Sequence, residues 1–169
     1  MRENLDVRIT RPLPLADLLE LATRKLKEML GVSDRLKIRT EAPTGAPFGV
    51  IPDLIPTRPK WGIYAHVEGA DESLVEINVS VLDAESGESP AVISFGEYRT
   101  PLSRGLTAAL AIAACELLGT EILDLEHIWC NRGQISADEL QRQLSVPEPQ
   151  ADVQSAAAEL QRRMNRKQW

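Results

Sequence analysis

The sequence predicts an α+β domain in which a mainly antiparallel sheet of five or six strands packs against two principal helices, followed by a C-terminal helix. Several short stretches alternate apolar and polar residues, which is typical of strands that bury one face. Two longer segments, 15–30 and 101–118, carry apolar residues at helical spacing, and a glycine follows each of them. We therefore expect a single domain over residues 1–146, and a linker with an amphipathic helix over residues 147–169.

Strands are expected where apolar residues recur at every second position. The stretches that meet this condition are residues 5–9, 36–38, 63–67, 75–81 and 91–95. Polar turns at 69–73 and 83–90 separate the last three stretches, so these three are predicted to form an antiparallel meander.

The segment 101–118 is predicted to be the central helix of the fold. Thr100 suits the N-cap position, Pro101 suits the first helical position, and Gly119 suits the C-terminal end. Alanine, leucine and isoleucine occupy almost every face of the segment. Because a helix that is apolar nearly all round has to be covered on most sides, we expect it at the centre of the core.

The end of the chain carries two further predicted helices. Ser136 and Glu139 form the pattern of a capping box, which opens a short helix ending at Leu144. Residues 151–164 then carry a narrow apolar stripe at helical spacing. Its members are Val153, Ala157, Leu160 and Met164. Such a stripe docks either on its own domain or on a second chain, and the second alternative predicts a homodimer through this helix.

The proline-rich segment 41–60 is predicted to be an irregular loop. It contains five prolines, which remove backbone donors and disfavour helix. It is nevertheless apolar, and such a loop either packs over the core or presents an apolar surface to a partner. We favour burial, because loops that cross a sheet are usually packed down. The candidate partner contacts on and beside the loop are Phe48, Ile51, Leu54 and Trp61.

The composition excludes some classes of function. The formal net charge is −6, whereas generic nucleic-acid binding requires clustered positive charge, so no nucleic acid is expected as a partner. A protein partner is expected to be basic, because opposite charges accelerate encounter. The longest apolar run, about residues 106–115, is too short to span a membrane, and the N-terminus lacks the apolar core of a secretory signal. With two cysteines expected as buried free thiols, a cytoplasmic location is predicted.

The cysteines and histidines do not form a complete metal pattern. His127 and Cys130 have the spacing H-x-x-C, and His66 and Cys115 would complete a set of two histidines and two cysteines. Zinc sites usually take their ligands in close pairs on turns, whereas Cys115 lies in the most apolar helix and His66 lies in a strand. We expect packing roles for these residues, and neither a metal nor a cofactor.

Arg99, Arg104 and Gly105 lie where a predicted strand leads into the central helix. Such a position attracts anions, although arginines in a turn of this kind also serve ordinary ion pairing. The stretch SRGLTAAL resembles the pyrophosphate loop R/Q-x-x-G-x-G/A of acetyl-CoA-dependent acetyltransferases of the GCN5-related family, and ITRPLPLADLLELA is similar to that family's first strand and helix. The resemblance implies an acyltransferase in which Arg104, Gly105 and the amides that follow would bind the pyrophosphate of an acyl-CoA.

The acidic segment after the central helix holds Asp124, Glu126 and Trp129. A carboxylate beside a buried helix can acquire a shifted pKa and a chemical role, but a solvated strand edge or a backbone-capping aspartate is the alternative that we favour. The stretch LTAALAIAACELLGTEILDLEHIW, followed by SADELQRQL, is similar to small cytoplasmic immunity domains of bacterial toxin systems. This resemblance implies a stoichiometric binder that occludes a partner.

The preferred function is therefore a protein-binding module, specifically an immunity-type inhibitor of a bacterial toxin. Its expected contacts are Phe48, Ile51, Leu54, Trp61, Asp124, Glu126 and Trp129. The alternatives are an acyl-CoA-dependent acyltransferase-like enzyme and a structural or assembly protein.

Overall fold

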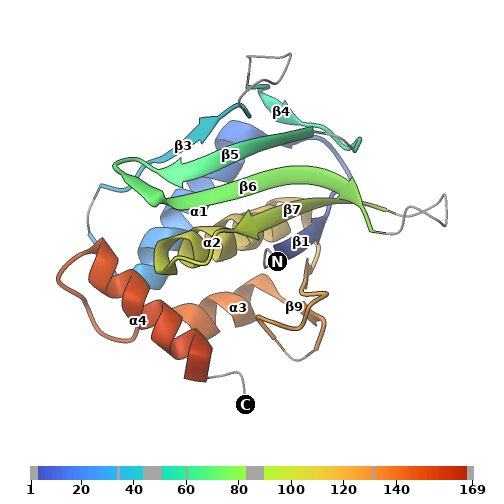
Figure 1. Ribbon diagram of the computed structural model, residues 1–169. Coiled ribbons are helices and arrows are strands. Elements are labelled where there is room, and N and C mark those ends of the chain that lie inside the picture. The colour runs from blue at the N-terminus through green and yellow to red at the C-terminus, as the bar shows by residue number, and fades with distance from the viewer. Residues whose placement is uncertain are drawn as a thin grey trace.

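The computed structural model describes residues 4–33, 35–43, 51–59, 61–82, 90–130 and 132–166. In this part of the chain the fold is α+β, as predicted, with a seven-stranded sheet, a two-stranded sheet and four helices (Figure 1). The helices are α1 (Leu15–Leu30), α2 (Pro101–Leu118), α3 (Ala137–Leu144) and α4 (Val153–Arg166). The strands are β1 (Asn4–Arg8), β2 (Leu13–Pro14), β3 (Ile38–Glu41), β4 (Leu54–Ile55), β5 (Trp61–Val67), β6 (Ala70–Val81), β7 (Ala91–Glu97), β8 (Ile122–Leu123) and β9 (Gln134–Ile135).

The strands of the large sheet follow the order β3-β5-β6-β7-β1-β8-β9, and every neighbouring pair is antiparallel. The predicted meander is confirmed as β5, β6 and β7. The first of its turns is tighter than predicted, because β6 already begins at Ala70 and Gly69 occupies the turn with φ 80°. The sheet exceeds the expected five or six strands because β8 and β9 have only two residues each, too few to show alternation.

The two faces of the large sheet differ in polarity. Leu5, Val7 and Phe95 point to the face that α2 covers, and all three are fully buried. Figure 1 shows α1 and α2 lying together against this face, with α3 and α4 beyond them. The opposite face carries the alternate residues, among which Asp6 of β1 lies directly across from Ser94 of β7. The helical layer therefore holds the core, and the other face is polar.

The position of α2 explains its composition. It contacts β1, β6 and β7 on one side and α1, α3 and α4 on the others, and every residue from 102 to 115 is buried. Among the residues that the structure describes, α2 is the one helix with the length and apolar composition to cross a membrane, but 78% of that window is buried inside the fold. Its apolar surface is thus accounted for by packing within the domain.

The predicted helix ends are confirmed. The Thr100 hydroxyl accepts a hydrogen bond from the Ser103 N–H at 3.1 Å, and the Ser103 hydroxyl accepts one from the Thr100 N–H at 3.2 Å. Pro101 occupies the first position of α2, and Gly119 ends it in the left-handed conformation with φ 66°. Ser136 caps α3 by accepting from the Glu139 N–H at 3.2 Å.

The apolar stripe of the C-terminal helix docks on its own domain. Leu160 is fully buried, and Met164 is 7% exposed. The helix packs against α2, α1 and α3 of the same chain. The stripe that predicted a homodimer is therefore already covered in cis, and the segment 147–166 adds a helix to the core of residues 4–146.

Candidate functional site

The entrance of α2 is built around a buried ion pair. Arg104, in the first turn of α2, donates from Nε to both carboxylate oxygens of Glu97, at 3.0 and 3.1 Å. Glu97 is the last residue of β7, and its side chain has no exposed surface. Arg104 is 9% exposed. The arginine predicted to bind an anion is thus engaged by a carboxylate of the neighbouring strand, which is the ion-pairing alternative.

Gly105 has a packing role in this structure. It is buried, and a Cβ added there would lie 3.4 Å from Leu26 Cδ1 and 3.8 Å from Leu160 Cδ1. These are ordinary van der Waals distances, so the position packs between α1 and α4. The Cα of Gly105 therefore faces two leucines of the core. Arg99, by contrast, is exposed and adopts φ 63° just before the cap.

This geometry gives a first testable prediction, for the acyl-CoA alternative. Acetyl-CoA at 1 mM is expected to leave the melting temperature unchanged, because Arg104 pairs with Glu97 and Gly105 is covered by leucines. A ligand at about 100 times its Kd would stabilise the protein by about 2.7 kcal/mol, which a thermal-shift assay detects easily. A clear rise in melting temperature that is lost in Arg104→Ala would contradict the packing interpretation.

The acidic segment after α2 folds around the carboxylate of Asp124. Its two oxygens accept backbone N–H groups of Ile128 at 3.1 Å, Trp129 at 2.6 Å and Cys130 at 2.6 Å. Its own N–H donates to the carbonyl of Gly133 at 2.9 Å. The strand β8 ends at Leu123, so the segment is a tight loop and not an extended strand. Asp124 is the backbone-capping aspartate of this loop.

Two of the three residues predicted to contact a partner on this segment are buried, which contradicts that prediction for them. Asp124 has no exposed surface and Trp129 is 8% exposed, so neither meets a partner in this conformation. Glu126 is exposed, and the neighbouring Leu125 is 55% exposed. The conformation of the loop explains why Asp124 is buried. Three backbone N–H groups of the loop point inward, and they need an acceptor inside the loop.

The proline-rich segment divides between the core and the surface. Ile51 and Trp61 are partly buried and pack against the core, while Leu54 is 50% exposed. Leu54 belongs to β4, which pairs with β2 ahead of α1. Phe48 lies outside the described residues. The prediction that the loop packs over the core therefore holds for Ile51 and for the adjoining Trp61, whereas the side chain of Leu54 is accessible to a partner.

The cysteines have the properties of packing residues. Cys115 donates from Sγ to the Thr120 carbonyl at 2.6 Å, at the end of α2. Burial raises the pKa of the Cys115 and Cys130 thiols, which keeps both protonated at neutral pH. Within the described ranges no three His, Cys, Asp or Glu side chains are grouped closely enough to hold a metal ion.

Asp6 is a buried acid that the sequence analysis did not single out. It lies on the polar face of β1, it is 9% exposed, and its Oδ1 has no hydrogen-bond partner among the described residues. Burial raises its pKa; a hydrogen bond from Ser94 opposes this rise, and the nearby charges of Glu126 and Asp124 add to it. Its strand was predicted from Leu5 and Val7, and the alternation placed Asp6 on the face assumed to be solvated.

The second prediction concerns the pH dependence that Asp6 introduces. Because its pKa is raised in the folded state, the folded protein is favoured when Asp6 is neutral and loses stability as pH rises from the unfolded value near 3.8 through the folded pKa. Asp6→Asn is therefore expected to be more stable than the parent chain at pH 7.5 and equally stable at pH 3.5. Urea unfolding of both proteins across this range measures the difference. A difference that is independent of pH would show that the carboxyl charge does not cause it.

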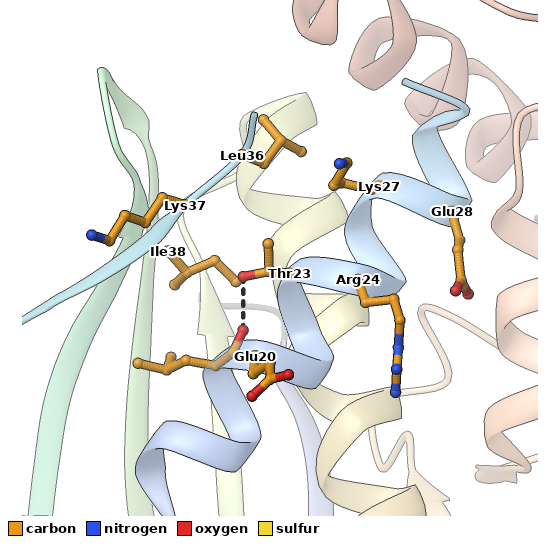
Figure 2. A pocket seen from close by; sticks show the side chains of 9 residues that line it. Glu20, Thr23, Arg24, Lys27, Glu28, Leu36, Lys37 and Ile38 are labelled. Carbon is orange, nitrogen blue, oxygen red and sulfur yellow. Dashed lines mark hydrogen bonds between the residues drawn. The ribbon is translucent and has the colours of Figure 1, made fainter. Parts of the chain in front are cut away.

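A groove runs between α1 and the segment that leads into the edge strand β3 (Figure 2). It has a volume of about 580 Å³ and is open to solvent. Leu19, Leu36 and Ile38 contribute its apolar lining, and Thr23 donates to the Leu19 carbonyl at 2.7 Å within the helix. The charged side chains that line it are Glu20, Arg24, Lys27, Glu28 and Lys37.

The groove was not predicted as a site. The spacing of residues 15–30 identified α1, and Leu36 with Ile38 identified a strand, but nothing in either pattern shows that the two segments meet. Leu19 and Leu36 are partly buried and pack against the core, so packing accounts for their apolar character and the sequence contains no separate signal of a groove.

Comparisons of the chain with protein-family models, with curated proteins and with solved structures find no match.

Proposed function

We propose that the chain is a protein-binding module that acts by stoichiometric association, and that an immunity-type inhibitor of a toxin is the specific class. The carrying observation is the groove between α1 and β3, which lies beside the outer edge of the large sheet. A helix and an edge strand that flank an apolar groove supply both side-chain contacts and main-chain pairing to a bound segment.

The charged side chains that were candidates for a catalytic or anion-binding role contact other groups of the protein, which supports a binding function. Arg104 and Glu97 pair with each other, and Asp124 caps a loop. An enzyme needs such groups directed at a substrate, whereas a binder does not. The alternative of a structural assembly protein was based on the apolar stripe of α4. This stripe is buried within its own domain, so it is not available for assembly.

The proposal is tested by purifying the full-length chain from its native host at native expression level. We expect a 1:1 complex with a second protein by mass photometry, and a titration in which inhibition of the partner's activity is complete at one equivalent. Elution of the chain alone, with no stable complex after crosslinking, would contradict a binding function.

A further inference from the structure

The strand β3 forms one end of the seven-stranded sheet. It pairs with β5 alone among the described residues, in the register Ile38 with Val67 and Thr40 with Ala65. The Glu68 N–H donates to the Lys37 carbonyl at 2.8 Å, so the main-chain groups of Lys37 face β5. Because N–H and C=O groups alternate in direction along an antiparallel strand, those of Ile38 and Thr40 face outward.

The outward-facing groups lie next to the groove. Leu36 and Ile38, which precede and begin β3, line the groove from the strand side, and Leu19 lines it from α1. An extended segment that pairs with Ile38 and Thr40 would therefore place alternate side chains toward the helix. A groove of about 580 Å³ accommodates one or two apolar side chains of such a segment.

The charge around the groove is opposite in sign to that of the whole protein. The side chains of Arg24, Lys27 and Lys37 form no ion pair or hydrogen bond within the described residues, although the charge of Lys37 also acts on Glu68. The two carboxylates of the lining are Glu20 and Glu28, and Glu28 keeps its charge although it accepts a hydrogen bond from Gln141 at 2.8 Å. With three cations against two carboxylates, the lining carries an excess of one positive charge in a chain whose net charge is −6.

We infer that the groove between α1 and β3 binds an acidic, extended segment of a partner protein, which adds to the sheet as a strand beside β3. This inference rests on the proposed binding function and names its site and the chemistry of the partner. The main-chain groups of Ile38 and Thr40 pair with the segment, an apolar side chain enters the groove, and Arg24, Lys27 and Lys37 attract the flanking carboxylates. The local charge therefore selects an acidic segment, although the net charge alone favoured a basic partner.

The test uses a capped twelve-residue peptide with four central valines and four glutamates at each end as the probe, so that flanking carboxylates lie on both faces of the bound strand, titrated into the ¹⁵N-labelled full-length chain. We expect saturable shifts of the Ile38 and Thr40 amide signals. The same peptide with lysine in place of glutamate is expected to bind at least roughly tenfold more weakly, because it reverses the sign of every charged contact at the groove. Absence of saturable shifts at millimolar glutamate peptide would overturn the inference.

Thr40→Pro tests the strand pairing specifically. The Thr40 N–H faces away from β5, so proline there removes an outward donor and leaves the inner ladder in place. Thr40→Val keeps the N–H and serves as the matched control. We expect Thr40→Pro to abolish binding of the glutamate peptide and Thr40→Val to retain it, with unchanged melting temperatures for both variants. Equal binding by the two variants would overturn the pairing.

The charge contribution is tested by the double variant Arg24→Gln with Lys37→Gln. Its matched control is Arg8→Gln with Arg58→Gln, which removes the same charge at two exposed positions that do not line the groove. We expect the groove variant to weaken binding of the glutamate peptide by roughly fivefold, and the control by less than about twofold. Equal weakening would mean that the peptide senses only the net charge, and this result would overturn the assigned site.

Two further outcomes would overturn the inference by showing that the groove binds something other than an acidic segment of a partner protein. A twelve-nucleotide single-stranded DNA that shifts the same amides at the same concentration would show a general anion site. A dimer in light scattering that is lost in Thr40→Pro would make a second copy of the chain the bound strand. If the native 1:1 complex forms equally well with Thr40→Pro, this inference fails while the binding function stands. If the parent chain itself forms no complex, the binding function fails.

Discussion

Asp124→Ala is expected to lower the free energy of unfolding by roughly 3 to 5 kcal/mol, because three amide donors of the loop, one buried and two partly buried, lose the carboxylate that accepts from them. The amides of Ile128, Trp129 and Cys130 all point to this carboxylate, which has no exposed surface. A loss of this size is a large part of the stability of an ordinary domain. Urea unfolding followed by tryptophan fluorescence measures it, and Trp129 reports directly on the loop.

Glu126→Ala is the matched control for this prediction. It removes a carboxylate two residues away that is exposed, so its effect is expected to stay within about 0.5 kcal/mol. Asp124→Asn keeps one acceptor oxygen and should fall between the two. If alanine at 124 costs no more than alanine at 126, the loop is not held by this side chain, and Asp124 becomes available again as a contact residue.

Removing either partner of the Glu97–Arg104 pair is expected to cost roughly 3 to 5 kcal/mol, because the remaining side chain is a buried charge that loses the opposite charge beside it. Glu97 has no exposed side-chain surface and Arg104 has 11%. The pair joins the end of β7 to the first turn of α2, so its loss also loosens the connection between the sheet and the central helix. Chemical denaturation of Glu97→Leu and Arg104→Met measures each single cost.

A double-mutant cycle separates the interaction energy between Glu97 and Arg104 from the energy of their contacts with other residues. Replacing both residues by apolar ones of similar volume, Glu97→Leu with Arg104→Met, is expected to recover stability to within about 1 kcal/mol of the parent chain. Additive losses in the double variant would mean that the two side chains act through separate contacts. An arginine whose role is anion binding predicts a third result, namely no stability loss for Arg104→Met.

Arg104 and Gly105 show how much of a site can be predicted from the spacing of residues alone. Arg104 and Gly105 were placed correctly at the entrance of a helix, and the choice between an anion site and an ion pair stayed open. Which alternative holds depends on whether a carboxylate faces the arginine, and the turn from β7 into α2 brings Glu97 there. The carboxylate lies only seven residues away, but its direction is set by the pleat of β7 against the helix.

The regular elements are local in origin, and the sequence by itself determined them. Alternation in β1, β5, β6 and β7, the helical spacing of α1 and α2, and the caps at Thr100 and Gly119 depend on neighbours within about one turn. The all-apolar composition of α2 even predicted its central position. Short strands such as β8 escaped prediction because two residues show no period.

The tertiary structure alone decided which side chains are turned inward and which surface is left open. Asp124 and Trp129 were expected at a surface and are buried, because a loop with inward amides requires its acceptor inside. The groove exists because α1 lies against the start of an edge strand, and that neighbour relation joins segments whose patterns are independent. Hydrophobic periodicity specifies which face of an element is buried, but only packing specifies what it is buried against.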